Sequence, residues 1–373
     1  MKKLLVSIIA CSVAASAAAQ TANEQKSGTA GASELLINPW AQSSGMANAH
    51  TAGIRGVEAI RLNVGGLARV NRTEIVFANT QWLKGSEVRI NSIGMAQPIG
   101  DNGGVLGFEV MAMDLGDFYL TTENNPDNNG IFDVNFINLG LSYSKAFSRS
   151  IFGGITVRAV SESLPNARAL GVCFDAGVQY ITNLGHNPDS LNGNFRIGVS
   201  LRNVGPPMSY SGDGLNRRVN ILSGNLAEEQ LTLNIPVEQF EIPSQLNIGA
   251  AYDYHVAQDH RITIAGNFNS NSFTLDQFQG GLEYGFMNRF MVRGGLDIQK
   301  NVFDEDKARV AHNGPTVGAT VQVPFGRSVT DTGLTEGEEA PSAAKNKLFG
   351  IDYSYRSTNV FSGTHSIGIR LSL

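Results

Sequence analysis

About fourteen segments, each roughly ten residues long, alternate between apolar and polar side chains along this chain. Phe290, Val292 and Ile298 share one face of such a segment, and Arg293 and Asp297 share the other. A period of two is the pattern of a β-strand with one apolar face. The segments lie near residues 73–83, 86–98, 103–114, 132–146, 150–162, 169–183, 193–206, 244–255, 259–269, 275–286, 289–300, 314–325, 346–357 and 362–373. The sequence therefore predicts an all-β fold.

Alternation alone does not separate a soluble β-sandwich from a membrane barrel, because both have one apolar face on each strand. The length and even number of the segments favour the barrel. Composition agrees, since charged residues make up only 16% of the chain and 42 residues are glycine. No stretch after the first twenty residues reaches the 18 apolar residues of a spanning helix. We expect a transmembrane antiparallel β-barrel of about 14 strands over residues 71–373.

The first 19 residues have the features of a secretory signal peptide. Lys2 and Lys3 precede an apolar run, and Ala17-Ala18-Ala19 precedes the expected cleavage site. A lipoprotein site at Cys11 is the alternative, although it would leave an unusually short apolar stretch. Cleavage removes two lysines from a chain of net charge −5, leaving about −7, so a nucleic-acid partner is not expected.

Residues 20–70 differ in pattern from the rest of the chain. The part from Leu35 to Val70 is rich in Gly, Ala and Asn, with weak helical periodicity and no alternation. It is predicted to be a plug inside the barrel lumen. Residues 21–33 are small and polar, which favours disorder.

The C-terminus resembles the last-strand signal read by the bacterial barrel-assembly machinery. Ser366, Gly368, Leu371 and Leu373 stand at the spacing of that signal, with Leu373 where Phe is commonest. A terminal strand with one apolar face can add its free edge to the assembly factor. The alternative is an ordinary amphipathic closing strand. With this end in the periplasm, the protein is expected to be a multi-pass outer-membrane protein in contact with lipid.

An even strand count places the odd-numbered connections outside, where long loops are expected. The connection from about Pro206 to Phe240 is the longest and is the candidate partner-contact loop, with Met208, Tyr210 and Leu215 as its named residues. Two connections do not fit: the first outward turn, at Lys84-Gly85, is very short, and the inward connection 326–345 is long. The reversed topology therefore stays open.

No catalytic constellation is apparent, so neither an enzyme nor a cofactor or metal is predicted. The six histidines lack metal-ligand spacing, and no nucleophile elbow is present. A calcium loop beginning at Asn125 fails, because Phe136 stands where a bidentate carboxylate is required. A Ser–His pair across neighbouring strands, as in a barrel phospholipase, stays possible. Charges of both signs on the predicted inner face favour ion pairs in a filled lumen: Arg158, Arg196, Arg202, Arg261, Arg293 and Arg370 with Glu109, Asp175, Asp253, Glu283, Asp297 and Asp352.

Several short motifs together resemble the PorV/PorQ family of outer-membrane proteins. They run over Asn63–Ala68, Asn194–Gly205, Ile242–Tyr252, Gly280–Tyr284 and Arg293–Gly295, with Val64 where the family usually has Pro. The resemblance implies a fourteen-stranded barrel similar to the long-chain fatty-acid transporter fold, with an N-terminal segment inside. It also implies a role in type IX secretion, in which such a barrel docks beside the translocon and receives the signal domain of secreted cargo.

The leading hypothesis is therefore a non-enzymatic accessory or shuttle of type IX secretion that binds translocon or cargo through its outer loops. The first alternative is a channel for hydrophobic small molecules, as the transporter-like fold permits. The second is a structural barrel that anchors a surface complex.

Overall fold

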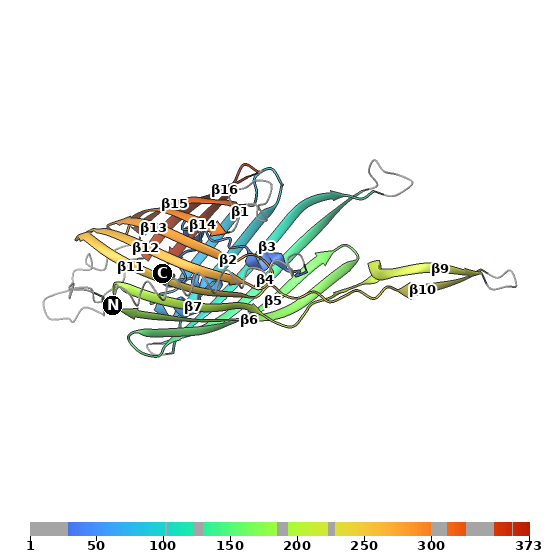
Figure 1. Cartoon of the computed structure of the whole chain (residues 1–373), viewed down its shortest axis with the longest axis horizontal. Coiled ribbons are helices and arrows are strands. Elements are labelled where there is room, and N and C mark those ends of the chain that lie inside the picture. The colour runs from blue at the N-terminus through green and yellow to red at the C-terminus, as the bar shows by residue number, and fades with distance from the viewer. Residues whose placement is uncertain are drawn as a thin grey trace.

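Fourteen antiparallel strands close into a barrel in the computed structural model, which describes residues 29–100, 103–121, 130–184, 193–222, 228–299, 312–325, 347–359 and 361–373. Each strand pairs with the next, and β1 pairs with β17, Glu74 lying opposite Ser372, so that the sheet closes (Figure 1). The barrel strands are β1 (Glu74–Gln81), β2 (Arg89–Pro98), β3 (Val105–Tyr119), β4 (Ile131–Ala146), β5 (Ile151–Leu164), β6 (Ala167–Thr182), β7 (Phe195–Val204), β11 (Gln245–Ala257), β12 (His260–Asn271), β13 (Gln277–Phe286), β14 (Phe290–Gln299), β15 (His312–Phe325), β16 (Lys347–Thr358) and β17 (Thr364–Ser372).

The fourteen predicted segments and the predicted fold class are confirmed. The largest difference in boundary is at β3, which continues to Tyr119 instead of ending near residue 114. A bulge between Asp114 and Asp117 interrupts its pairing with β4, which then resumes. The rings of Phe118 and Phe132 stack on each other in this outer part, with centroids 5.5 Å apart. The alternation of apolar and polar side chains ends before this extension of β3, because both faces of the extension are exposed to solvent.

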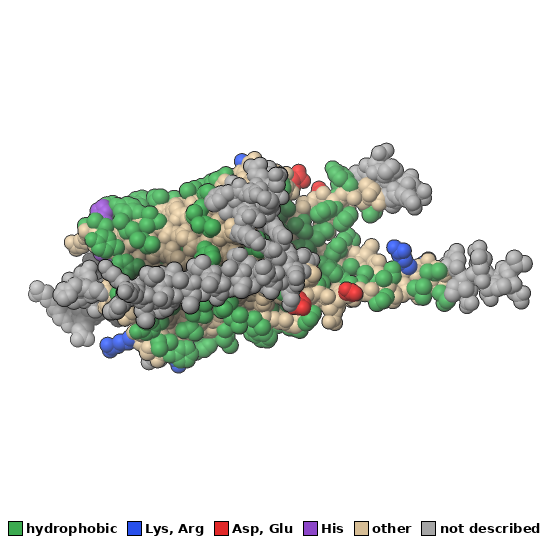
Figure 2. All heavy atoms as spheres, viewed as in Figure 1, with side chains coloured by type: hydrophobic (Ala, Val, Ile, Leu, Met, Phe, Trp, Pro, Cys, Tyr) green, Lys and Arg blue, Asp and Glu red, His purple; other side chains and the backbone are tan. Residues whose placement is uncertain are grey.

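The barrel has apolar side chains outside and polar side chains inside, the reverse of a soluble protein. Leu141 is 64% exposed and Val292 is 61% exposed, whereas the neighbouring inward-facing Arg158 and Arg293 are almost completely buried. The resulting apolar belt covers much of the outer surface (Figure 2). Because only lipid accommodates such a belt, the barrel is of the outer-membrane type.

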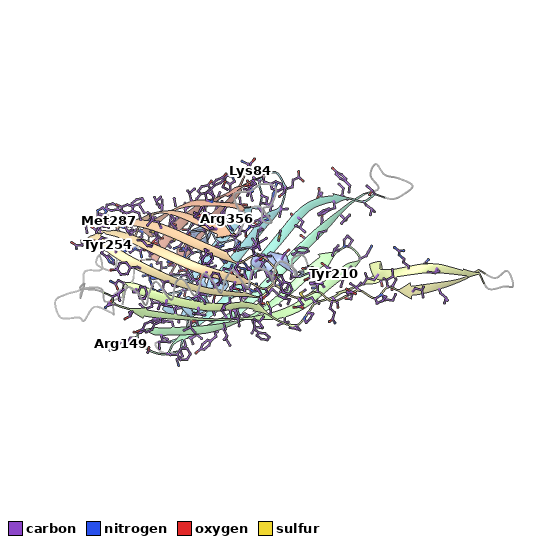
Figure 3. The ribbon with its side chains drawn as sticks, viewed as in Figure 1. Lys84, Arg149, Tyr210, Tyr254, Met287 and Arg356 are labelled. Carbon is purple, nitrogen blue, oxygen red and sulfur yellow. The ribbon has the colours of Figure 1, made fainter. Side chains whose placement is uncertain are left out.

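Tight turns connect β11 to β12 and β13 to β14 at the end of the barrel where the chain finishes, whereas the equally short β5–β6 turn, Pro165-Asn166, lies at the other end. Met287 and Asn288, both with positive φ, are the central residues of the turn between β13 and β14, which Arg289 closes by donating its N–H to the Phe286 carbonyl. The final residue, Leu373, donates its N–H to the Thr73 carbonyl at the same end. With the C-terminus in the periplasm, as the sequence predicts, this end is the inner one; it lies at the left of Figure 3, where Arg149, Tyr254 and Met287 are labelled. The long inward connection predicted at 326–345 lies outside the described residues.

The long connection between β7 and β11 contains structure of its own. Its elements are β8 (Tyr210–Ser211), η3 (Asp213–Leu215), β9 (Asn216–Leu222) and β10 (Glu228–Asn234). β9 and β10 pair only with each other and form a hairpin that projects from the outer end of the barrel (Figure 1).

A segment before β1, residues 29–72, runs through the lumen. It contains η1 (Ser33–Leu36), α2 (Ala41–Ser44), α3 (Ala59–Leu62) and η2 (Val64–Arg69), all short. The expectation of disorder is wrong for residues 29–33, because Gly31 donates its N–H to the Glu241 carbonyl and Ala32 donates its N–H to Glu162. In the part of the chain that the structure describes, no helix is long and apolar enough to span a membrane.

Candidate functional site: the filled lumen and its outer end

A ring of inward-facing glycines makes room for the lumen segment at mid-height. A Cβ added to Gly198 would lie 2.6 Å from the Thr51 carbonyl oxygen, and one added to Gly295 would lie 2.5 Å from the carbonyl carbon of Met46. The backbone of the lumen segment therefore fits against the wall only at wall positions that carry no side chain. Eight glycines on eight strands make such contacts within 3.2 Å: Gly94, Gly107, Gly177, Gly198, Gly249, Gly281, Gly295 and Gly318.

Asn63, the first residue of the Asn63–Ala68 motif, fastens the segment to the wall. Its amide nitrogen donates to the carbonyls of Thr51, at 3.0 Å, and of Val178 on β6, at 3.1 Å. Its side-chain oxygen accepts the N–H of Gly65 at the start of η2. Gln179 on the same strand donates to the Ile54 carbonyl at 2.9 Å. Asn63 and Gln179 thus connect two parts of the segment, residues 51–54 and the start of η2, to β6.

Ion pairs line the lumen on the inner side of the glycine ring. The Arg370 guanidinium lies 2.9 Å from Glu58 of the lumen segment, 3.2 Å from Glu74 and 3.2 Å from Asp352. Hydrogen bonds continue from Asp352 through Thr320 to Arg293. Together with side chains on the next four strands, β13, β12, β11 and β7, these residues form one connected girdle over nine neighbouring strands.

The rest of the girdle alternates in charge from strand to strand. Arg293 and Arg261 lie 2.6 and 2.5 Å from the two carboxylate oxygens of Glu283. Asp253 pairs with Arg261 and with Arg196 on β7. The predicted ion pairs between inner-face charges are confirmed for these residues. Such pairs suit a closed interior, since each buried charge needs a partner.

A second buried cluster lies across the lumen. Glu109 on β3 lies 2.7 Å from Arg61 of the lumen segment and 3.4 Å from Arg158. Arg158 also lies 3.0 Å from Asp175 on β6. Because Arg61 and Glu58 both pair with wall residues, the segment is tied by charge to β3 and to β17.

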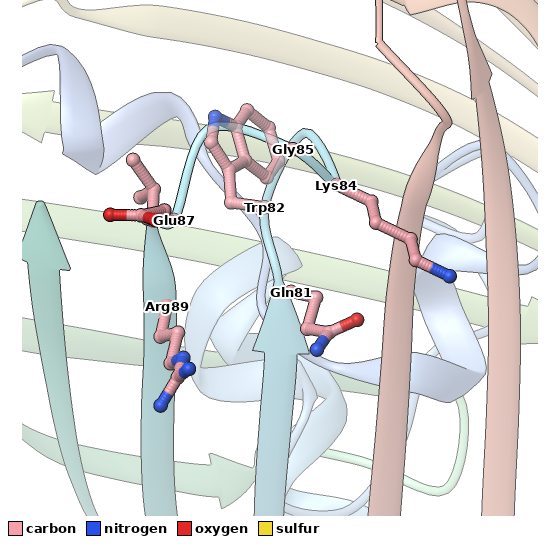
Figure 4. A pocket seen from close by; sticks show the side chains of 7 residues that line it. Gln81, Trp82, Lys84, Gly85, Glu87 and Arg89 are labelled. Carbon is pink, nitrogen blue, oxygen red and sulfur yellow. The ribbon is translucent and has the colours of Figure 1, made fainter. Parts of the chain in front are cut away.

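The outer half of the lumen is apolar over β2 to β4. Ile90, Met111 and Met113 form a buried cluster there, and Trp82 and Phe136 pack against it. A small pocket of about 130 Å³ adjoins this cluster at the turn between β1 and β2 (Figure 4). It is well below the several hundred Å³ usual for ligand sites. Its lining is Gln81, Trp82, Lys84, Gly85, Glu87, Val88 and Arg89.

The start of the lumen segment is held at the outer end of the barrel by polar contacts around Glu162. The Tyr210 hydroxyl and the Ala32 N–H both donate to the Glu162 carboxylate. The Glu34 carboxyl is buried without a hydrogen-bond partner. Burial, and then repulsion from Glu162, raises the pKa of Glu34 to about 7.

The residues named for the candidate contact loop lie at the base of that connection. Met208 is buried, and its backbone forms a pair of hydrogen bonds with Phe240. Tyr210 and Leu215 are half-buried, and Tyr210 marks the outer end of the wall in Figure 3. The exposed apolar side chains of the connection come later in the sequence, among them Leu231 and Leu233. Partner contact by this loop stays a prediction.

The residues of the proposed assembly signal all lie on or directly after β17. Ser366 accepts a hydrogen bond from Thr80, and Gly368 faces Ala41 of the lumen segment. Leu371 is half-buried, and Leu373 is exposed beyond the last strand. Recognition by the assembly machinery stays a prediction. Among the described residues, no three His, Cys, Asp or Glu side chains are grouped to hold a metal ion.

No protein-family model and no curated protein matches the chain. Solved structures do match. A deletion mutant of the TodX monoaromatic hydrocarbon channel gives a TM-score of 0.51 at 14% identity, covering 89% of this chain and 97% of that one. The crystal structure of the Pseudomonas putida toluene transporter TodX gives 0.50 at 12% identity, covering 86% and 94%. A Pseudomonas aeruginosa FadL homologue gives 0.44 at 10% identity, covering 89% and 97%.

At these identities the likeness concerns the fold. It places the chain among closed fourteen-stranded outer-membrane barrels of the kind that hydrophobic-molecule transporters use. The two TodX structures are those of a toluene transporter and of a mutant monoaromatic hydrocarbon channel. The PorV/PorQ resemblance therefore rests on the sequence motifs alone.

Proposed function

We propose that this outer-membrane barrel acts without catalysis, by binding another protein at its outer end, as an accessory of type IX secretion. The observation that carries the proposal is the β9–β10 hairpin, which projects from a barrel whose lumen is occupied by residues 29–72. A filled lumen leaves the outer end as the surface on which such a protein can act.

The hairpin has the properties of a strand-pairing site. Two strands alone are marginally stable in water, because their edges and faces stay unpaired. Leu231 is 43% and Leu233 is 52% exposed, and both lie on β10. A partner segment that adds a strand to this hairpin would cover these side chains and pair the free edge.

The pathway and the partners come from the sequence resemblance. Members of the PorV/PorQ family bind the type IX translocon and the signal domains of secreted cargo, so these are the partners we propose. The motifs that carry the resemblance also have structural roles here: Asn63 fastens the lumen segment, and Gly295 makes room for it.

A channel for hydrophobic small molecules is the second candidate, and the fold likeness to the toluene transporter favours it. The apolar cluster of Ile90, Met111 and Met113, with the adjoining pocket at Trp82, is the surface in this lumen that suits such a molecule. Passage would require the lumen segment to move away from the glycine ring.

One pair of variants separates the two candidates. Leu231→Ser with Leu233→Ser should reduce capture of translocon and cargo by cross-linking in native membranes, and should leave toluene uptake unchanged. Thr232→Ala, between them on the opposite face, is the matched control. If the barrel is a channel, Met111→Gln should reduce toluene uptake and leave the capture of translocon and cargo unchanged. Lost uptake with normal secretion in a deletion strain would reject our proposal, and loss of neither would favour a structural anchor.

A further inference from the structure

Eight amide side chains cluster on the inner face of four adjacent strands, in the outer half of the lumen. We call this cluster the amide patch. Seven of its members are at most 6% exposed, and Gln277 is half-buried. The patch consists of Gln245 and Asn247 on β11, Asn267, Asn269 and Asn271 on β12, Gln277 and Gln279 on β13, and Gln299 on β14.

Hydrogen bonds connect the patch across the strands. The Asn267 amide nitrogen donates to Gln279 at 2.8 Å and to Asn247 at 3.2 Å. Gln245 donates to Asn271 at 2.6 Å. These bonds hold each amide plane in place, so the remaining polar atoms have fixed directions.

One polar atom of each of several members has no protein partner. The unpartnered donors are the amide nitrogens of Asn247 and Gln299, and the unpartnered acceptors are the amide oxygens of Gln245, Asn267 and Asn269. Carboxylate oxygens of Asp276 and Asp297 beside the patch are also unpartnered. Buried polar atoms are nearly always paired. Seven such atoms in one place point to a ligand.

The patch has a fixed place above the lumen segment. On β13, Gln279 is followed at the same face by Gly281, which contacts Met46, and then by Glu283 of the ion-pair girdle. β11 repeats this order with Asn247 and Gly249. The segment therefore lies directly below the amides on these two strands.

Filling the lumen does not by itself require amides at this height. Across the barrel, at the outer ends of β2 and β3, the same task is done by Ile90, Met111 and Met113. These three side chains need no hydrogen-bond partner, and beside them only Ser92 on β2 and Asn138, opposite Met111 on β4, have unpartnered polar atoms among the described residues, fewer than the seven at the amide patch. Unpartnered polar atoms are therefore more numerous at the amide patch, which favours a polar occupant on that side.

We infer that the amide patch binds an uncharged polyhydroxylated ligand, such as an oligosaccharide. A hydroxyl group both donates and accepts, which matches a patch that presents both unpartnered amide donors and unpartnered amide acceptors. The amides carry no charge, and the nearby Asp297 is opposed by Arg356, so an ionic ligand is not favoured. This inference does not depend on the proposed function.

The test uses the whole folded barrel in an amine-oxide detergent, which has no sugar headgroup. Maltotriose is the probe, and isothermal titration calorimetry measures its binding. We expect saturable binding that the double variant Asn247→Leu with Gln299→Leu weakens about tenfold, since two hydrogen bonds are lost. Asn138→Leu is the matched control, because Asn138 is also a buried, unpartnered inward amide, but on β4.

A shift in gel mobility on heating shows whether each variant is folded. If the leucine variant does not fold, Asn247→Asp with Gln299→Glu keeps the shape of both side chains while removing the same two donors. Absence of saturable maltotriose binding by the native protein would overturn the inference. Equal weakening by Asn138→Leu would also overturn it. Retained binding in the Leu231→Ser, Leu233→Ser variant separates this site from the proposed protein contact.

Discussion

Gly45 of the lumen segment and Gly318 on β15 lie backbone to backbone: a Cβ built on either one would be 2.9 Å from the Cα of the other. Gly318→Val should therefore push the segment off the wall, because neither backbone can give way cheaply. We expect the free energy of unfolding to fall by about 1–3 kcal/mol. Limited trypsin digestion should also cut more readily within residues 41–69.

Gly280→Val is the control for this change. Gly280 lies on β13 with its hydrogens toward lipid, and an added Cβ would meet nothing within 4 Å. The same side chain should be tolerated there. If both valine variants keep native stability and trypsin resistance, the glycine ring does not hold the segment.

Arg370 joins three carboxylates, from Glu58, Glu74 and Asp352. Arg370→Met should destabilise the folded barrel by about 3–5 kcal/mol, because it leaves buried carboxylates without a counter-charge. The heat-modifiable gel shift should occur at a lower temperature. Arg89→Met, at an exposed position on β2, is the control and should change the transition little. Adding Glu58→Gln to the Arg370 variant should restore part of the loss if charge is the cause.

The strands could be predicted because each has one apolar face toward lipid. In the sequence the apolar Val292 is followed by the charged Arg293, and in the barrel wall the first faces lipid and the second faces the lumen. The charge of the lumen was predictable for the same reason: once Arg293 and Glu283 face inward on neighbouring strands, their pairing follows.

The glycine ring and the amide patch were not predicted from the sequence. In the sequence alone, Gly249 and Gly281 do not differ from the other glycines of a glycine-rich chain. Their contact with the lumen segment follows only once the register between the strands is known. An inward amide such as Asn267 differs little in a single strand from a solvated polar residue. Both features depend on which residues share one height in the barrel, and that requires the stagger of all strands. A signal was present, since Gln279-x-Gly281 and Asn247-x-Gly249 repeat one order.

Asn63→Ala should loosen the lumen segment. The change removes the hydrogen bonds donated to the Thr51 and Val178 carbonyls and the one accepted from the Gly65 N–H, although Gln179 still donates to Thr51 at 3.3 Å. The buried Gly65 N–H, left unpaired, costs about 1–3 kcal/mol. Hydrogen exchange of the peptide over residues 59–69, followed by mass spectrometry, should become faster. Asn63→Asp keeps the acceptor for Gly65 and loses both donors, so its exchange should be intermediate; exchange equal to the native protein in both variants would contradict the role.

The attachment of residues 29–36 at the outer end should weaken as pH rises, because the pKa of Glu34 is raised from 4.5 to about 7 by burial and by Glu162. Below pH 4.5 the carboxyl is neutral whether the segment is attached or released, and the attachment is at full strength. Between pH 4.5 and 7 the released form ionises first, which costs the attached form up to about 3 kcal/mol. Hydrogen exchange of residues 29–36 should therefore be faster at pH 8 than at pH 5, after correction for intrinsic rates. Glu34→Gln should abolish this difference, whereas Glu87→Gln, at an exposed position in the turn between β1 and β2, should leave it; an unchanged difference in Glu34→Gln would assign the pH dependence to another group.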